Sequence, residues 1–317
     1  MSPLPPLIVI AGPTAVGKTA AAIALALRHG GEIVSADSRQ VYRGMDIGTA
    51  KPSPDELAAV PHHLLDVRNP DEPFSLTDYV ALARAAIADI HARDRLPILA
   101  GGTPLYLNAV VEGWRVSPVP PDLALRARLE QEVTAHGLAT LEARLAAVDP
   151  VVAGRARGNA RRVVRALEVY TLTGQPMSAQ ERKEPPPYRI WHAVLTLDRA
   201  ALHARIDARV ERMVAAGLVE EVRALLERGY APGLPALSGI GYAEIVAYLR
   251  GEGTLPDAVA RIKTNTHRYV RHQETWFRRN HAAERVDVAA PDWLGRLDAR
   301  VSAELAVAGG QSSVTET

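Results

Sequence analysis

The amino-terminal part of the chain alternates between short apolar runs and longer amphipathic stretches. Apolar runs at residues 7–11, 32–36 and 96–100 have the length and composition of buried strands. The stretches at 20–28 and 75–92 have apolar residues at helical spacing and are long enough to connect parallel strands. This alternation predicts an α/β fold in which βαβ units form a parallel sheet.

The pattern changes between two proline-rich stretches, at residues 116–122 and 184–188. Between them the chain has the pattern of successive helices without a convincing strand, which predicts an all-helical insertion domain. A further apolar run at 191–197 could return the chain to the sheet, after which helical patterns dominate. The predicted domains are a core formed by 1–117 with 186–317, including carboxy-terminal helices, and an insertion at 118–185.

The composition is that of an ordinary globular protein. Of 317 residues, 47% are apolar and 23% are charged, which argues against a disordered, collagen-like or coiled-coil chain. No apolar run approaches the roughly 18 residues of a membrane helix, and the amino terminus lacks the basic segment of a secretory signal. The absence of cysteine excludes disulfides, thiolate zinc sites and cysteine nucleophiles. We expect a cytoplasmic protein with no membrane partner.

The basic residues are clustered, although the net charge is only +1. Five arginines with no acidic residue among them lie between 155 and 165, inside the predicted insertion. A second cluster, at 261–279, contains six basic residues and one acidic residue. Each cluster is either a solvated helix face or a surface that binds a polyanion.

A glycine-rich motif, GPTAVGKT, follows the first predicted strand and precedes the first predicted helix. Its G-x-x-x-x-G-K-[ST] spacing is typical of a phosphate-binding loop, in which backbone amides and the helix dipole surround an anion. The motif predicts a P-loop NTPase-like core that binds a di- or triphosphate, but it does not identify a nucleotide. Lys18 would supply a positive charge, and the Thr19 hydroxyl is a candidate ligand for Mg²⁺. The residues assigned to the phosphates are Gly12, Pro13, Thr14, Ala15, Val16, Gly17, Lys18 and Thr19.

Two polar residues follow later strands at the same predicted edge of the sheet. Thr103 follows the strand at 96–100, and Asp37 follows the strand at 32–36. Because ligands of open α/β sheets bind beyond the carboxyl ends of the strands, both side chains should face the phosphate loop. Kinases and ATPases of this fold usually end a later strand in an acidic residue, which is missing after the third strand here. Asp37 is therefore either the acidic residue of the site or a helix N-cap.

The motifs together resemble those of the bacterial tRNA dimethylallyltransferases, also called tRNA isopentenyltransferases. The resemblance covers nearly the whole chain, and the order and spacing of the motifs make it specific. Besides the phosphate loop, it rests on DSRQVYRGMDIGTAKP at 37–52, PHHLLDV at 61–67, AGGTPLY at 100–106, RRVVRALEVYTLTG at 161–174, IGYAEI at 240–245 and QETWFR at 273–278.

The resemblance implies that a dimethylallyl group passes from dimethylallyl diphosphate to the exocyclic amine of the adenine 3′ to a tRNA anticodon, with release of diphosphate. The phosphate loop, Mg²⁺ and basic residues would neutralise the leaving diphosphate. Asp37 matches the family's general base, and Thr103 matches its threonine at the reacting amine. Arg209 matches an arginine near the diphosphate, with Arg205 one turn earlier, although without the resemblance a solvated surface would be the simpler interpretation of both.

The resemblance also implies a tRNA anticodon stem-loop as partner. Since the target adenine is stacked inside that loop, it must be turned out of the stack to reach the site. Trp276 and Phe277 could contribute a stacking surface, but at this spacing they are more often helix core. The residues that match tRNA contacts are Asp37, Ser38, Arg39, Gln40, Thr103, Arg161, Arg162, Val163, Val164, Arg165, Gln273 and Arg278.

Three other functions share part of these features. They are a phosphate-loop kinase of a nucleoside or small metabolite, an RNA-binding ATPase that holds ATP in the loop, and a prenyl transferase that acts on free adenine nucleotides. The long basic insertion favours a polynucleotide acceptor over a free nucleotide. The sequence does not determine the oligomeric state, for which a monomer is the working expectation.

Overall fold

The computed structural model describes residues 4–115, 117 and 119–309 of the chain. These residues form two compact units. The first, here called the core unit, comprises the residues up to Val110 and those from Pro187 onward, and the second, the helical unit, is Val111–Pro186. The predicted domain boundary at residue 118 falls on a position outside the described residues.

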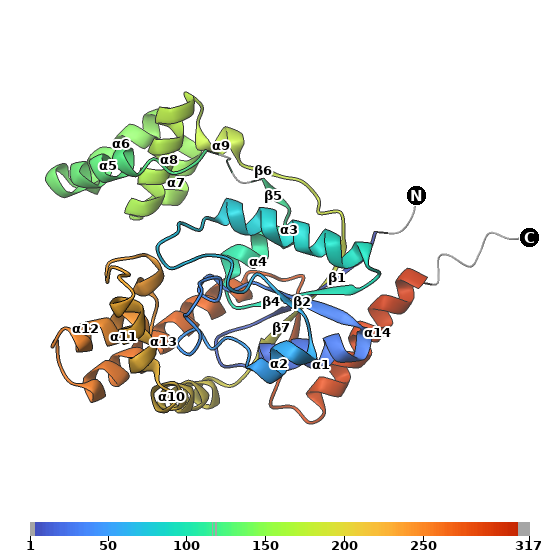
Figure 1. Ribbon diagram of the computed structural model, residues 1–317. Coiled ribbons are helices and arrows are strands. Elements are labelled where there is room, and N and C mark those ends of the chain that lie inside the picture. The colour runs from blue at the N-terminus through green and yellow to red at the C-terminus, as the bar shows by residue number, and fades with distance from the viewer. Residues whose placement is uncertain (1–3, 116, 118, 310–317) are drawn as a thin grey trace, which may run out of the picture. The chain divides into compact units, whose positions relative to one another are not determined.

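The core unit contains a six-stranded sheet in which every strand pair is parallel, in the order β3-β2-β4-β1-β7-β8 (Figure 1). The predicted α/β fold is thereby confirmed. The two central strands are continuous apolar runs because both faces of a parallel sheet are covered. The two edge strands are short and polar, and the hydrophobic pattern did not predict them. The strands are β1 (Pro6–Ala11), β2 (Gly31–Ser35), β3 (His62–His63), β4 (Leu96–Gly101), β7 (Arg189–Thr196) and β8 (Glu284–Asp287).

Helices cover both faces of the sheet. Figure 1 shows α3 on one face and α1 with α14 on the other. The first helix ends in a left-handed Gly30, and α3 begins with a capping box formed by Ser75 and Asp78. Helices α10 to α13 follow β7 in the chain. The helices are α1 (Lys18–His29), α2 (Pro54–Ala59), α3 (Leu76–Ala92), α4 (Pro104–Val111), α10 (Arg199–Ala215), α11 (Leu218–Glu227), α12 (Tyr242–Leu249), α13 (Leu255–Arg278) and α14 (Trp293–Gly309), with a 3₁₀ turn at Ala236–Ser238.

Helices α10 to α13 extend the core of the sheet and do not form a separate layer. The buried residues Ile206, Val222, Tyr242 and Ile262 belong to the same apolar cluster as the central strands. A single continuous core therefore fixes these helices relative to the strand ends.

The helical unit has an apolar core of its own, which includes Leu129, Leu145, Val163 and Val164. It also contains a short antiparallel ribbon, so the prediction of an all-helical domain was incomplete. The two strands of the ribbon are only two residues long, which is too short to leave a pattern in the sequence. The elements are α5 (Leu123–His136), α6 (Leu138–Val148), α7 (Pro150–Ala156), α8 (Ala160–Thr173), α9 (Met177–Gln180), β5 (Trp114–Arg115) and β6 (Arg182–Lys183).

Within the described part of the chain, no helix combines the length and the apolar character needed to cross a membrane.

Candidate active site

The phosphate loop lies between β1 and α1, as its motif predicts. Gly17, in a left-handed conformation, is the N-cap of α1 and has no side chain with which to cap the first amides. These amides are therefore oriented to bind an anion. The Lys18 ammonium donates a hydrogen bond to the carbonyl of Pro13 at 2.8 Å, which draws the side chain back across the loop.

The pKa of Lys18 lies far below that of an ordinary lysine. Burial and, second, the positive charge of Arg209 lower the pKa of Lys18 to about 7, while the carboxylate of Asp37 acts in the opposite direction. Burial also lowers the pKa of Arg209, and Asp37 again opposes the shift. Two cations and one carboxylate thus lie close enough to influence one another, and a bound anion would relieve the repulsion between the cations.

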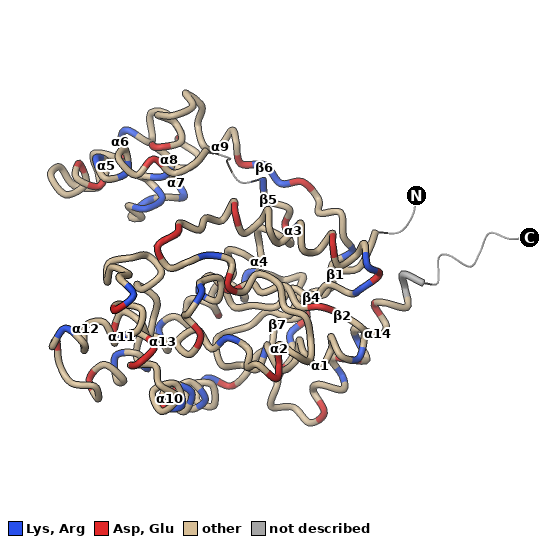
Figure 2. Tube along the Cα trace, in the orientation of Figure 1, with Lys and Arg blue, Asp and Glu red and all other residues tan. Residues whose placement is uncertain are grey.

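The cavity at the phosphate loop has a volume of about 550 Å³ and faces α10, on which Figure 2 shows several basic positions. Arg205, Arg209 and Arg212 line it from one face of that helix, and Arg205 donates a hydrogen bond to the carbonyl of Val16 at 3.3 Å. Thr19 and Glu56 supply its hydroxyl and carboxylate. We call this space the phosphate-loop cavity.

A second cavity, of about 280 Å³, contains Asp37 and shares Arg209 with the first. We call it the Asp37 cavity. Ser38 and Arg39 line it from the same loop as Asp37. Its apolar wall is formed by residues of α10, α12 and α13, with one from the loop between α11 and α12, namely Ile206, Val210, Met213, Ile240, Tyr242, Ile262 and Tyr269.

Asp37 caps the turn that follows it and still has a free carboxylate oxygen. Its Oδ1 accepts hydrogen bonds from the amides of Arg39 at 2.8 Å and Gln40 at 3.4 Å. Among the described residues, none donates a hydrogen bond to its Oδ2. The interpretation of Asp37 as a helix N-cap was wrong, because the segment after it is a turn and the next helix begins only at Pro54. Oδ1 shapes that turn, and Oδ2 can accept a substrate proton.

Thr103 is bound to the segment that carries Asp37. Its amide donates to the carbonyl of Ala36 at 3.1 Å, and its Oγ1 accepts from the amide of Ser38 at 3.1 Å. This close approach depends on Gly101, because a Cβ atom there would lie 2.2 Å from the Ala36 carbonyl oxygen. The ends of β2 and β4 thus hold the aspartate and the threonine side by side.

Helix α13 also contributes polar side chains to this site. The side chain of Gln273, which is only 2% exposed, accepts from the amide of Thr14 at 3.0 Å and donates to the carbonyl of Gly102 at 2.6 Å. It therefore ties the phosphate loop to the segment that carries Thr103. Tyr269 lies near Thr103 and Gln273, and burial, followed by the charge of Asp37, raises the pKa of Tyr269 to about 12.

Three residues predicted to contact tRNA form hydrogen bonds within the protein. Arg39 donates to the carbonyls of Pro235 at 2.6 Å and Ala236 at 3.3 Å, so its guanidinium joins two loops. The side-chain amide of Gln40 is used within its own loop. Gln273 is buried as described above, which favours a positioning role over an RNA contact.

The predicted contacts on α8 separate into two groups. Val163 and Val164 are buried in the core of the helical unit, so their side chains are not exposed for contact with a tRNA. The prediction took a continuous stretch of sequence, whereas residues that share one face of a helix lie three or four positions apart. Arg165 bonds with buried Glu168, whereas Arg161 and Arg162 are exposed.

Arg278, at the end of α13, lines a third cavity of about 350 Å³ that also touches Pro13. Its guanidinium donates to Thr275 Oγ1 at 3.2 Å. Arg199, the first residue of α10, lines the same cavity, but neither Asp37 nor Lys18 does.

Sequence reasoning missed Tyr269, Arg212 and Glu56. Arg212 could have been found, because it continues the helical spacing of Arg205 and Arg209. Nothing in the local sequence distinguishes Glu56, which closes a capping box with Ser53. In the described residues, no group of three or more His, Asp or Glu side chains could hold a metal ion alone.

Comparison with known proteins shows the family to which this chain belongs. The sequence model of a family described as IPP transferase matches residues 40–280. Two relatives named tRNA dimethylallyltransferase are similar over almost their full length. The protein from Roseiflexus castenholzii is 56% identical over 93% of this chain and 97% of its own. The protein from Thermomicrobium roseum is 52% identical over 95% of this chain and 92% of its own.

Two solved structures are also similar. The full-length tRNA isopentenylpyrophosphate transferase from Bacillus halodurans is 39% identical, with a TM-score of 0.72 over 96% of this chain and 98% of its own. A eukaryotic dimethylallyltransferase, described as acting on tRNA, is 28% identical, with a TM-score of 0.76 over 89% of this chain and 74% of its own.

Proposed function

Because this chain belongs to the IPP transferase family, we propose that it is a prenyl transferase that moves a dimethylallyl group from dimethylallyl diphosphate to the exocyclic amine of the adenine 3′ to the anticodon of tRNA. One observation carries the assignment of the site. The phosphate-loop cavity and the Asp37 cavity meet at Arg209, so a diphosphate and a base can lie on either side of one cation.

The donor would bind in the phosphate-loop cavity. The amides of the loop and the side chains of Lys18 and Arg209 surround the diphosphate and neutralise the charge that develops as the carbon–oxygen bond breaks. Because these groups are already held in place by the fold, they need little reorganisation when the bond breaks. Arg205 and Arg212 extend the cationic wall along α10.

The acceptor adenine would enter the Asp37 cavity after leaving the stack of the anticodon loop. Its amine attacks the allylic carbon, and a new carbon–nitrogen bond replaces the bond to the diphosphate. The amine must lose a proton in this step, and Oδ2 of Asp37 is the acceptor. Thr103 lies beside Asp37 and can hydrogen bond to the amine or to the diphosphate.

Mg²⁺ would accompany the donor. Thr19 and Glu56 line the phosphate-loop cavity with oxygen atoms, which are the ligands that Mg²⁺ prefers. The ion would take most of its remaining ligands from phosphate and water, and when bound it would withdraw charge from the leaving diphosphate.

The helical unit would contribute an electrostatic surface for the tRNA. Arg157, Arg161 and Arg162 are exposed near the start of α8, where they can pair with RNA phosphates. Such a substrate implies that the protein works in the cytoplasm with tRNA.

Mass spectrometry of the product tests this function. Unmodified tRNA with adenine 3′ to the anticodon is incubated with dimethylallyl diphosphate or with ATP, and a matched tRNA with guanine at that position is the control. We expect a mass gain of one five-carbon prenyl unit on the adenine tRNA only. Phosphoryl transfer or ATP hydrolysis without prenyl transfer would contradict the proposal in favour of a kinase or an ATPase.

A further inference from the structure

Hydrogen bonds join the two ends of the loop that begins at Asp37, the segment 37–51. Gln40 accepts a hydrogen bond from Ser35 Oγ at 3.1 Å and donates to the carbonyl of Thr49 at 3.3 Å. The two ends of the segment 37–51 are therefore joined through one side chain. These bonds fix the two ends of the loop. The position of the turn at 46–48, here called the tip of the loop, depends on other contacts.

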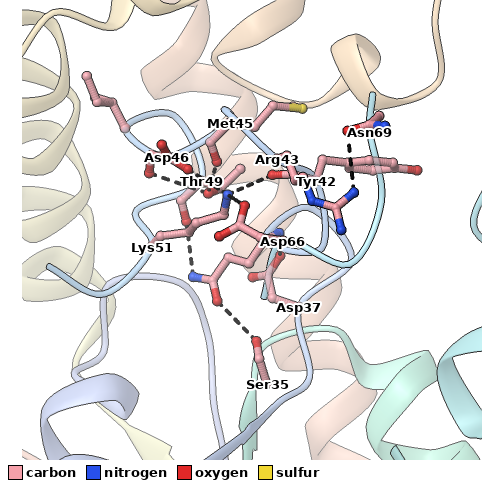
Figure 3. A network of polar contacts seen from close by, with 12 residues as sticks. Ser35, Asp37, Tyr42, Arg43, Met45, Asp46, Thr49, Lys51, Asp66 and Asn69 are labelled. Atoms are coloured by element: carbon pink, nitrogen blue, oxygen red, sulfur yellow. Dashed lines mark hydrogen bonds and ion pairs between the residues drawn. The ribbon is translucent and has the colours of Figure 1, made fainter. Parts of the chain in front are cut away.

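Lys51 holds the inside of the same loop. Its ammonium donates to the carbonyl of Tyr42 at 2.7 Å and to the carboxylates of Asp46 and Asp66, each at 2.6 Å. Figure 3 shows these bonds, with Asp37 beside them. The side chain of Lys51 is 5% exposed and its three donors are all used, so its charge serves the loop and does not face a substrate.

The tip of the loop is bound by Glu221 of α11. Its Oε2 accepts from the amides of Asp46 at 2.8 Å and Ile47 at 2.7 Å, and its Oε1 accepts from the amide of Gly48 at 3.1 Å. Three successive backbone amides thus surround one carboxylate, in the arrangement that proteins use to bind anions. The loop has a built anion site, and a side chain of the same protein occupies it.

Tyr242 completes this contact from α12. Its hydroxyl donates to Glu221 Oε1 at 2.6 Å, and its ring is 1% exposed. Burial and the charge of Glu221 raise the pKa of Tyr242, which keeps the phenol protonated as a donor. The ring packs so tightly on Gly48 that a Cβ atom there would lie 2.5 Å away.

The contact lies at the wall of the Asp37 cavity. Gly48, Thr49 and Tyr242 all line that cavity together with Asp37. A shift of the loop tip would therefore change both the shape of the cavity and the position of the carboxylate at the start of the loop.

We propose that Glu221 is a positioning residue of the transfer reaction, which seats the turn at 46–48 against Tyr242 and thereby sets the position of Asp37. The inference rests on the proposed prenyl transfer. Glu221 touches neither the donor nor the amine and acts only through the loop. Glu221 affects the rate by fixing the position of a reacting group, because a displacement of about 1 Å at such a group can cost roughly 100-fold in rate.

The test is Glu221→Gln, with Glu220→Gln as the matched control. Glu220 is the preceding residue of α11, is exposed, and has Arg223 as its ion-pair partner at 3.7 Å. We expect Glu221→Gln to lower the single-turnover rate at saturating substrates about 10- to 100-fold, and Glu220→Gln to leave it unchanged. Binding of inorganic pyrophosphate should stay within about twofold in both variants, because the phosphate loop does not depend on this contact.

A double-mutant cycle separates positioning from general stability. If Glu221 acts through Asp37, Glu221→Gln should slow the Asp37→Asn variant much less than it slows the wild type. Equal effects in the two backgrounds would overturn the proposal, and so would an unchanged rate in Glu221→Gln. If Glu221→Gln does not fold, Tyr242→Phe takes its place in the double-mutant cycle, because this substitution removes one hydrogen bond to the Glu221 carboxylate. Prenyl transfer by the wild type and Glu220→Gln would support the proposed function in every one of these cases.

Discussion

Both units carry arginines that we assign to phosphate groups, but their surroundings differ. In the core unit, Arg209 is half-buried between two cavities, and burial lowers its pKa. In the helical unit, Arg161 and Arg162 are exposed on the first turn of α8. A charge that is partly removed from water acts strongly at short range, whereas an exposed charge is screened by water and salt. The same residue type can therefore support chemistry in one unit and general attraction in the other.

This difference predicts two kinds of response to substitution. Changes in the enclosed site should alter the rate or the donor affinity steeply and depend little on salt. Changes on α8 should alter tRNA affinity modestly, additively and in a salt-dependent way.

The largest effect is expected for Asp37→Asn, because it removes the base but keeps the cap. The amide oxygen of asparagine can still accept from the amides of Arg39 and Gln40. Since general-base help is typically worth 10² to 10⁴, the single-turnover rate should fall by roughly that factor, while pyrophosphate affinity changes little.

Asp71→Asn, at an exposed position, is the control for loss of a carboxylate. A rate for Asp37→Asn within a few-fold of wild type would end the general-base assignment and leave Asp37 with its capping role alone. Thr103 or a water molecule would then have to accept the proton.

The next largest effect is expected for Lys18→Ala. A hydrogen bond to a charged group is worth about 1.5 to 3 kcal/mol, so pyrophosphate should bind at least tenfold more weakly. Lys183→Ala, an exposed lysine of the helical unit, should leave this affinity unchanged. Isothermal titration with inorganic pyrophosphate is the measurement, and equal affinities for the two variants would place the diphosphate elsewhere.

The parts of the site that sequence could predict are those set by local pattern. The spacing of Gly12 to Thr19 and the apolar runs before Asp37 and Thr103 determine which residues reach the carboxyl edge of a parallel sheet. Because all the strands are parallel, knowing where each run ends is enough to bring these residues together. The structure confirms this part of the prediction for the phosphate loop, Asp37 and Thr103.

The parts that could not be predicted depend on contacts between distant segments. Gln273 bonds with Thr14 across 259 positions, and Glu221 bonds with the turn at 46–48 across more than 170. A glutamate in the first turn of a helix is common for reasons of the helix dipole alone, so α11 gives no sign of a second role. The second role of Glu221 becomes visible only in the folded structure, where α10 to α13 are packed together.

A smaller effect is expected from pH, through Lys18. The free enzyme holds Lys18 at a pKa of about 7, and a bound diphosphate should raise it, because an anion favours the ammonium form. Between the two pKa values, binding must take up a proton. Pyrophosphate also titrates in this range, so the contribution of Lys18 is the ratio of the affinities of wild type and Lys18→Arg. This ratio should be constant below pH 7 and fall by up to about tenfold per pH unit above it.

Titration calorimetry between pH 6 and 9, in buffers of different ionisation enthalpy, measures both the affinity and the proton uptake. In Lys18→Arg only the titration of pyrophosphate itself should remain, since arginine stays charged over this range. A wild-type profile parallel to that of Lys18→Arg would mean that Lys18 is already protonated in the free enzyme.

The smallest effects are expected on the helical unit. Because exposed ion pairs are worth about 0.2 to 1 kcal/mol, substituting Arg157, Arg161 or Arg162 by glutamine should each weaken tRNA binding about two- to fivefold. The triple substitution should be additive and should flatten the logarithmic salt dependence of affinity by about two units. Arg165 is left in place because it shares buried Glu168 with Arg126, and loss of one of the two partners of that buried carboxylate would destabilise the unit.

Arg144→Gln, on α6 of the same unit, is the matched control for loss of one positive charge. If it weakens binding as much as Arg161→Gln, the attraction comes from the net charge of the unit and the arginines near the start of α8 form no specific surface. If the triple substitution instead lowers the single-turnover rate at saturating tRNA, the exposed arginines take part in bringing the adenine to the Asp37 cavity. The contrast between an enclosed site for chemistry and an open surface for attraction would then fail, because a screened surface charge should change how often the complex forms and leave the rate within it unchanged.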